Sequence, residues 1–365
     1  MKVYLDYAAT TPLIPEVFEE MLPVLKEDFG NPDSLHAAGR RAAQYVTDAR
    51  DRIAGVLGVK SSEIYFTSGG TEADNWAVRA MGKGGAIVSP IEHAALLSAA
   101  PLRVLGESKF CGVGEDGIVR LSDFVGTVSE EVGLVCVMAV NNETGCVQPI
   151  EELAKATHAR GAAFFSDCVQ AACSQDLKKI ASACEGISLS AHKIGGPKGV
   201  GALVVKKGVS LRPVIVGGEQ ERSLRGGTLN VAGIVGFARA LELAQERREA
   251  FCVHTAHLRD FFEQKIIEAL GSGITVDGKN RAPNVSHLTF ERGGEALLNL
   301  LDLRGVMASG GAACSAHAAL PSHVLTAMGR SPDEAKRGIR FSFGFETTEE
   351  ETLFAAQTVI EALKG

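Results

Sequence analysis

The stretch "SLSAHKIGGPKGVGALVV", residues 188–205, puts one lysine in an unusual setting. Lys193 follows Ser190 and His192 and precedes a glycine turn, and an apolar stretch rich in valine comes next. Small residues and glycines let a backbone pass close to a bound ring, and an apolar strand keeps an amine dry, which makes it more nucleophilic. The stretch therefore favours a reactive lysine at the edge of a buried sheet over the alternative, a solvated lysine on a loop.

Short apolar segments and amphipathic segments alternate on the N-terminal side of this lysine. Apolar strands separated by amphipathic helices indicate a mostly parallel sheet that is covered on both faces, an α/β fold. The predicted strands are 63–68, 86–89, 134–140, 162–167, 187–191 and 201–207, and the predicted helices are 14–25, 37–57, 71–82, 94–99 and 150–161.

The pattern changes after this region. A long helical stretch, roughly 230–270, leads into a mixture of predicted strands and helices over 273–365. This mixture predicts a smaller α+β domain beside the large sheet domain. We expect residues 14–250 to form the large, cofactor-binding domain, and residues 1–13 plus 251–365 to form the small one.

A glycine-rich turn follows the first predicted strand of the sheet. In "TSGGTEADN", Gly70 lets the backbone come close to a ligand and Thr71 opens a helix. The N–H groups and dipole of a helix N-terminus attract a phosphate. Ordinary helix capping is the alternative explanation of the same pattern.

Other polar residues follow further strands, at the sheet edge where open α/β sheets bind ligands. His93, Asn142 and Asp167 each come just after a predicted strand, and Gln170 follows three residues after the aspartate. Each has a structural alternative: a packed histidine, a turn asparagine and a helix-capping aspartate. Asp167 could also be a buried anion that needs a partner.

Together these residues match the needs of pyridoxal 5'-phosphate. Its aldehyde needs a lysine amine, and its ring nitrogen needs an acid partner. Lys193 and Asp167 supply these two groups, and Ser190 and His192 can add donors to the phosphate loop. We therefore expect this cofactor at one edge of the sheet.

Composition excludes several other classes of protein. The 365 residues carry a net charge of −7, which argues against direct nucleic-acid binding and against binding to an anionic membrane surface. The longest apolar run, 132–140, is too short to span a membrane, and the first residues lack a secretory signal. The eight cysteines form no C-x-x-C pair, so we expect no metal site and a reduced, cytoplasmic location.

Several motifs resemble those of the NifS/IscS-type cysteine desulfurases, which are fold-type I pyridoxal phosphate enzymes of the class V aminotransferase kind. The resemblance covers nearly the whole chain, and the motifs follow in the family's order. They are "YLDYAATTP" (4–12), "FGNPDSLHAAGRRA" (29–42), "TSGGTEADN" (67–75), "VNNETGCVQPI" (140–150), "SAHKIGGPKGVGAL" (190–203), "RSLRGGTLNV" (222–231) and "ASGGAACSA" (308–316).

The resemblance implies roles for the residues that bind the cofactor. Lys193 would form the Schiff base, Asp167 would pair with the ring nitrogen, and His93 would stack on the ring and move protons. Asn142 and Gln170 would bond the ring hydroxyl. The implied phosphate ligands are Gly70, Thr71, Ser190, His192 and, from the other subunit of a homodimer, Thr228.

The resemblance also implies the reaction. Arg340 would hold the substrate carboxylate, together with Asn142, since a planar guanidinium suits that task. Cys314 lies in "MASGGAACSAHAALPS", a stretch of small residues that predicts a loop rather than a buried element. This cysteine would take the sulfur of L-cysteine as a persulfide, leave L-alanine, and pass the sulfur to an acceptor such as an iron–sulfur scaffold or a tRNA-thiolation enzyme.

Three alternatives remain at this point. Another class V aminotransferase-type enzyme would not need Cys314. A selenocysteine lyase would discriminate selenium from sulfur. A non-catalytic protein that keeps the fold would be expected to lack Lys193 or Asp167, and both are present.

Overall fold

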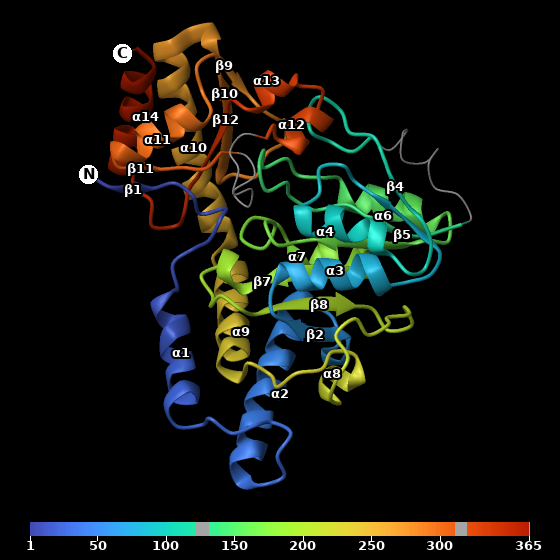
Figure 1. Ribbon diagram of the computed structural model, residues 1–365. Helices are drawn as coiled ribbons and strands as arrows, with labels where there is room; N and C mark the ends of the chain where they lie inside the picture. The colour runs from blue at the N-terminus through green and yellow to red at the C-terminus, as the bar shows by residue number, and fades with distance from the viewer. Residues whose placement is uncertain (121–130, 311–319, 365) are drawn as a thin grey trace.

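A seven-stranded sheet forms the centre of the molecule (Figure 1). The computed structural model describes residues 1–120, 131–310 and 320–364. In spatial order the strands are β2 (Ile64–Thr67), β8 (Gly201–Val205), β7 (Gly186–Ser190), β6 (Ala163–Asp167), β5 (Val132–Cys136), β3 (Gly85–Val88) and β4 (Ser108–Phe110).

Most of these strands run in the same direction, which confirms the predicted mostly parallel sheet. Strands β7, β6, β5, β3 and β4 pair in parallel, and β8 alone is antiparallel to its neighbours β7 and β2. Strand β4 was not predicted, because it has three residues, lies at the sheet edge and is largely exposed. The predicted strand 134–140 instead spans Val132–Cys136.

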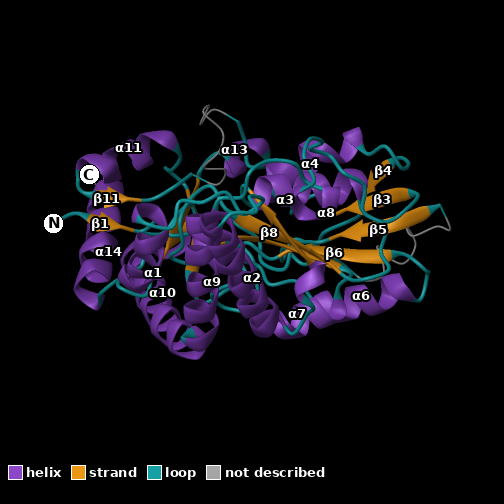
Figure 2. Ribbon diagram, turned by 90° about the horizontal axis from the view of Figure 1, so that it is seen from below, coloured by secondary structure: helices purple, strands orange, loops and turns teal. Residues whose placement is uncertain are grey.

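Helices cover both faces of this sheet, as the apolar strands predicted (Figure 2). One face carries α3 (Gly70–Ala80) and α4 (Ala94–Ala99), and the short α8 (Gln220–Ser223) lies on the same side. The other face carries α2 (Ala37–Leu57), α6 (Ile150–His158), α7 (Leu177–Ala183) and α9 (Val231–Glu246), and α1 (Pro15–Lys26) packs against α9.

Helix α2 shows how the sequence determines where a helix begins and ends. The ring of His36 accepts a hydrogen bond from the backbone N–H of Gly39 at its start, and Gly58 ends it in the left-handed conformation at φ 67°. Ala42, Val46 and Ile53 of its apolar stripe are buried. The apolar stripe thus fixes which side of the helix faces the core.

A second, smaller hydrophobic core lies beside the large sheet (Figure 1). Its antiparallel sheet has the order β12-β10-β9, and β1 pairs in parallel with β11. The strands are β1 (Val3–Tyr4), β9 (Ile274–Val276), β10 (Val285–Phe290), β11 (Val306–Met307) and β12 (Gly338–Ser342), and the helices are α10 (Arg248–Leu270), α11 (Glu295–Leu303), α12 (His323–Ala327), α13 (Pro332–Ala335) and α14 (Glu349–Lys364).

Residues from both ends of the chain build this second core. Val3 and Leu5 pack with apolar residues from α10, β10, β12 and α14. The predicted helical stretch 230–270 proves to be two helices, because Arg247 has a non-helical backbone between α9 and α10. The domain limits at residues 13 and 250 stay a prediction.

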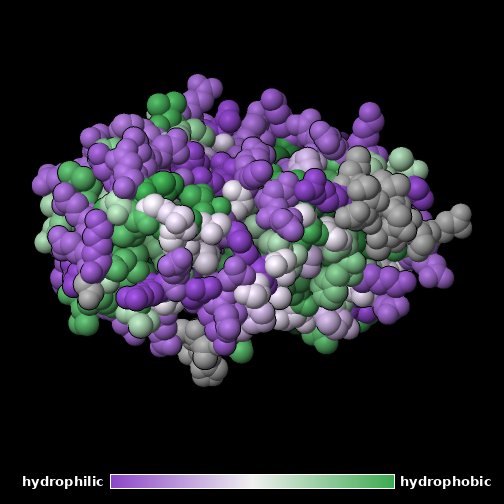
Figure 3. Space-filling view, turned by 90° about the horizontal axis from the view of Figure 1, so that it is seen from above, coloured by the Kyte–Doolittle hydropathy of each residue, from purple (hydrophilic) through white to green (hydrophobic). Residues whose placement is uncertain are grey.

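The surface carries mainly hydrophilic side chains on the face seen in Figure 3, with smaller hydrophobic groups between them. Within the described part of the chain, no helix combines the length and apolar character that crossing a bilayer requires.

The small core offers a direct test of its packing. The buried ring of Phe262 lies 4.7 Å from that of Phe341 and 5.7 Å from that of Phe343, between centroids. We expect Phe262→Ala to lower the free energy of unfolding, measured in urea, by about 3–5 kcal/mol, because it leaves a cavity. Phe261→Ala, at the half-buried neighbouring position, is the matched control. Equal losses in the two variants would contradict this packing.

Candidate active site

A cavity of about 530 Å³ opens at the carboxyl ends of the central strands. Strands β6 and β7 end at Asp167 and Ser190 on its wall, and helix α3 begins there directly after β2. Ten of the residues predicted from the sequence line this cavity: Gly70, Thr71, His93, Asn142, Asp167, Gln170, Ser190, His192, Lys193 and Arg340. The sheet thus brings together side chains that are up to 270 positions apart in the sequence, from Gly70 to Arg340 (340 − 70 = 270).

Lys193 ends a short 3-10 turn, Ala191–Lys193, that follows β7. Its Nζ donates hydrogen bonds to the carbonyl oxygens of Ala8, at 2.6 Å, and Ala9, at 2.8 Å. The glycine turn that follows is a packing requirement, because Gly195 has φ 79° and a Cβ there would lie 2.2 Å from Cδ1 of Ile14. The N-terminal segment therefore packs directly on the lysine turn.

The N-terminus of α3 and the end of β7 form a polar cradle. Gly70 is tightly enclosed, since a Cβ would come within 2.7 Å of Cγ2 of Val169. Ser190 is buried beside it, and Nδ1 of His192 lies 3.1 Å from Oγ1 of Thr10. Burial lowers the pKa of His192 to about 4, and the charges of Lys193 and Lys198 act in the same direction. The ring is therefore neutral at physiological pH.

Asp167 is a buried carboxyl group at the end of β6. Its side chain accepts a hydrogen bond of 2.8 Å from the backbone N–H of Val169. Burial raises the pKa of Asp167, whereas that hydrogen bond and the charges of His93 and Lys193 act to lower it. The carboxyl group thus lies among groups that favour its ionised form, despite its burial.

His93 caps helix α4 at the cavity wall. Its Nδ1 accepts a hydrogen bond of 3.1 Å from the backbone N–H of Ala95, so the neutral ring carries its proton on Nε2. Burial lowers the pKa of His93, and the nearby charge of Asp167 opposes this shift. The ring is thereby held in one orientation with a defined tautomer.

Arg340 reaches the cavity from strand β12 of the small core. Its guanidinium donates to the carbonyl oxygen of Asn142, at 2.6 Å, and to Oδ1 of Asp6, at 2.8 Å. The side chain is 2% exposed, and its Nε is buried without a hydrogen-bond partner among the described residues. The same holds for Oδ1 of Asn142, while Nε2 of Gln170 donates to the carbonyl oxygen of Ala8 at 2.7 Å. Asn142 and Arg340 therefore keep unused polar atoms at this site.

The roles of two predicted residues stay untested. Thr228 is exposed and lies outside the cavity, so its expected contact with a cofactor of the partner subunit stays a prediction. Cys314 lies outside the described residues, and its role likewise stays a prediction.

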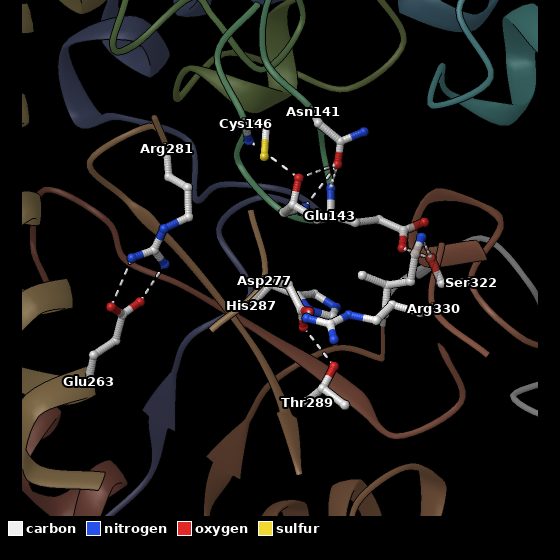
Figure 4. Close-up of polar contacts among 12 residues, drawn as sticks. Asn141, Glu143, Cys146, Glu263, Asp277, Arg281, His287, Thr289, Ser322 and Arg330 are labelled. Atoms are coloured by element: carbon white, nitrogen blue, oxygen red, sulfur yellow. Dashed lines mark hydrogen bonds and ion pairs between the residues drawn. The ribbon is translucent and has the colours of Figure 1, made fainter. Parts of the chain in front are cut away.

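The sequence analysis assigned no role to several polar residues of the cavity wall, among them Asp74, Glu143 and His323. Asp74 and Glu143 stand inside "TSGGTEADN" and "VNNETGCVQPI", so the motifs contained the signal although no role was assigned to these positions. Oε2 of Glu143 accepts a hydrogen bond of 2.5 Å from Ser322 (Figure 4), and Nε2 of His323 lies 2.9 Å from the carbonyl oxygen of Glu92. These contacts join the cavity wall to the segment that begins at residue 320.

A buried carboxylate fixes the end of the same segment (Figure 4). Asp277 accepts hydrogen bonds from Nδ1 of His287, at 2.9 Å, from Oγ1 of Thr289, at 2.6 Å, and from Nη2 of Arg330, at 3.0 Å. Burial acts to raise the pKa of Asp277, but these partners lower it on balance. Residues 322–330 are therefore tied to the cavity at one end and to the small core at the other.

The site fits the expected pyridoxal phosphate. The cradle around Gly70 has room for no side chain, and the buried Asp167 can pair with a ring nitrogen. Lys193 lines the same cavity and is bonded to the N-terminal segment. The unpartnered Oδ1 of Asn142 offers one further hydrogen bond. Within the described residues, no group of histidine, cysteine and acidic side chains has the arrangement of a metal site.

Comparison with known proteins agrees with this geometry. The model of the family "Aminotransferase class-V" matches residues 3–353. A "Cysteine desulfurase IscS" from Dictyoglomus turgidum is 41% identical over 377 residues, covering 100% of this chain and 95% of that protein.

Solved structures give the same result. A "NifS-like protein" superposes with a TM-score of 0.90 at 36% identity, covering 100% of both chains. A structure titled "SspA in complex with cysteine" has a TM-score of 0.81 at 32% identity, covering 93% of this chain and 98% of that one. The chain therefore belongs to the class-V aminotransferase family of pyridoxal phosphate enzymes, in its NifS/IscS-type group.

Proposed function

We propose that this protein is a cysteine desulfurase that removes the sulfur of L-cysteine and leaves L-alanine. The observation that supports this most strongly is one cavity lined by Lys193, Asp167 and Arg340. An amine, a buried acid and a buried guanidinium are what a pyridoxal phosphate enzyme needs to bind its cofactor and the carboxylate of an amino acid. The names of the relatives favour cysteine as that amino acid.

In this proposal the cofactor is held at its aldehyde, its ring nitrogen, its ring face and its phosphate. Lys193 binds its aldehyde covalently, Asp167 pairs with the ring nitrogen, and His93 lies on the ring face. The phosphate is held at the N-terminus of α3, where Gly70 contributes backbone and Thr71, Ser190 and His192 contribute side chains. When bound, pyridoxal phosphate supplies an electron sink that stabilises negative charge at the α-carbon of the substrate.

Four residues of the chain act on the substrate. Arg340 binds the carboxylate of L-cysteine, assisted by Asn142. Lys193, once the amine of the substrate has replaced it at the cofactor aldehyde, would take the proton from the α-carbon through Nζ. His93 holds and returns protons beside the ring through Nε2. The carbonyl oxygens of Ala8 and Ala9 orient the Lys193 amine, since both accept hydrogen bonds from it.

Cys314 then receives the sulfur. Its thiolate attacks the sulfur atom of the substrate, so that an S–S bond forms on Cys314 and the C–S bond breaks. The electron pair of the broken bond stays on the substrate carbon, which takes up protons and leaves as L-alanine. The sulfur remains as a persulfide on Cys314 until an acceptor thiol takes it.

We further infer a homodimer. Phe29 and Leu35 are 84% and 90% exposed, which is unusual for side chains of this size. A hydrogen bond of 2.6 Å joins Asp33, between them, to Gln220, whose Oε1 accepts from the backbone N–H of Gly227 at 3.0 Å. The apolar side chains therefore share a surface with the neighbour of Thr228, the residue expected to reach the other subunit.

The acceptor of the sulfur is an iron–sulfur scaffold or a tRNA-thiolation enzyme in this proposal, and the reaction takes place in the cytoplasm. Selenocysteine lyase remains the second candidate, because the same carboxylate clamp and lysine would serve either substrate. Comparing the rates with L-cysteine and L-selenocysteine distinguishes them, since a lyase would accept only the selenium compound.

The first prediction concerns the sulfur acceptor of the chain itself. We expect Cys314→Ala to keep the visible absorbance of the bound cofactor but to abolish sulfide release from L-cysteine in the presence of dithiothreitol. Cys173→Ala is the matched control and should keep the parent rate, since Cys173 lies beside the carbonyl oxygen of Lys193 but has no assigned role. Sulfide release at the parent rate by Cys314→Ala would refute the mechanism.

The second prediction concerns the covalent link. Borohydride reduction of the parent protein should fix the cofactor on the peptide that contains Lys193, and Lys193→Ala should show no fixed cofactor. Lys198→Ala, which removes another cavity lysine, should be labelled like the parent. An undiminished adduct in Lys193→Ala would overturn the role given to this lysine.

The third prediction concerns the dimer. Leu35→Asp should weaken association at least ~10-fold in sedimentation experiments, because it buries an unpaired charge in the interface. Leu303→Asp, at an equally exposed leucine of α11, should leave association unchanged. A parent protein that sediments as a monomer, or a Leu35→Asp variant that associates like the parent, would contradict the proposed dimer.

A further inference from the structure

Asp74 is a buried acid beneath the cavity to which the proposed reaction gives no role. It lies one turn into α3, is 1% exposed and contributes to the cavity wall. Oγ of Ser188, on β7, donates a hydrogen bond of 2.6 Å to its Oδ1. A side-chain hydrogen bond also links Asp74 to Asp167, which lies on the neighbouring strand β6 and is 4% exposed. Side chains from three elements therefore meet behind the cofactor site.

Two adjacent carboxyl groups in such a setting cannot both be ionised at low cost. Burial raises the pKa of Asp74 well above its usual range, and the charges of Asp167 and Glu92 raise it further. Asp167 differs, because the Val169 N–H and the charge of Lys193 favour its ionised form and oppose the rise in its pKa that burial causes. These contacts favour the proton of the pair on Asp74 rather than on Asp167.

The position of this proton follows from the hydrogen bonds. Oδ1 of Asp74 accepts from Ser188, and the side chains of Asp74 and Asp167 also share a hydrogen bond, in which a neutral Asp74 is the donor and an ionised Asp167 the acceptor. A neutral acid that donates a hydrogen bond to a buried carboxylate stabilises the charged form of that carboxylate.

We propose that Asp74 is a positioning residue that works as a neutral acid: it donates a hydrogen bond to Asp167, keeps Asp167 ionised and aligned for the ring nitrogen of the cofactor, and is itself oriented by Ser188. Asp74 does not touch the reacting atoms. The inference rests on the proposed cofactor site and adds a residue behind it.

The test compares two substitutions. The affinity of each apoprotein for pyridoxal phosphate is measured from the absorbance of the bound cofactor, at pH values from acidic to alkaline. Asp74→Asn keeps a neutral donor of the same shape, so we expect the affinity and pH dependence of the parent. Asp74→Ala removes the donor, and we expect about 10-fold weaker binding at neutral pH. The loss should grow as the pH falls, because Asp167 then takes up a proton more readily.

Three outcomes would overturn the proposal. They are parent-like binding by Asp74→Ala, an equal loss in Asp74→Asn and Asp74→Ala, and tighter binding by both variants at acidic pH, which would mean that Asp74 is charged in the parent. Ser188→Ala should cause a smaller loss than Asp74→Ala. If Asp74→Ala does not fold, Asp74→Val gives the same comparison, since valine has no hydrogen-bond donor.

The pH dependence separates this role from a merely structural one. A substitution that only loosened the core would lower thermal stability and affinity equally at every pH. A parent apoprotein that binds no pyridoxal phosphate would refute the proposed function itself, whereas a parent that binds it and shows no contrast between the variants would refute only the role of Asp74.

Discussion

The N-terminal segment connects the two halves of the proposed active site through hydrogen bonds at both of its ends. Asp6 bonds Arg340 of the small core, and the carbonyl oxygens of Ala8 and Ala9 bond Lys193 at the edge of the large sheet. The backbone N–H of Ala8 also donates to Oγ of Ser342, beside Arg340 on β12. The group that would bind the substrate carboxylate and the group that would take its α-proton are therefore spaced by one short segment.

The central sheet supplies the other constraint. The strands that run in the same direction end along a single edge of the sheet. Residues that follow β2, β3, β6 and β7 therefore line the same cavity. Burial at that edge then sets the protonation states. Burial and the charges of Lys193 and Lys198 lower the pKa of His192, which favours a neutral ring, and Asp167 lies among groups that stabilise its charge. The same edge of the sheet thus brings these residues together and shifts their pKa values.

The sequence allowed the sheet, its helices and ten cavity residues to be predicted, because buried strands are apolar throughout and the motifs fall at their ends. The sequence did not show which atoms form hydrogen bonds with those residues. Nothing in "YLDYAATTP" indicates that backbone carbonyls of Ala8 and Ala9 hold a lysine about 185 positions away. Strand β4 was missed because an exposed three-residue edge strand has no apolar pattern. Asp74 was missed because its proposed role depends on a contact with Asp167, which lies on a different element of the fold.

The account depends most on Cys314 as the residue that carries the sulfur. The direct measurement is peptide mass spectrometry of the protein after incubation with L-cysteine, alkylation and proteolysis without reduction. We expect one additional sulfur atom on the peptide that contains Cys314 and on no other cysteine peptide. Additional sulfur on a peptide containing Cys173 or Cys252 instead, or L-alanine formed without sulfur on any cysteine, would contradict the account.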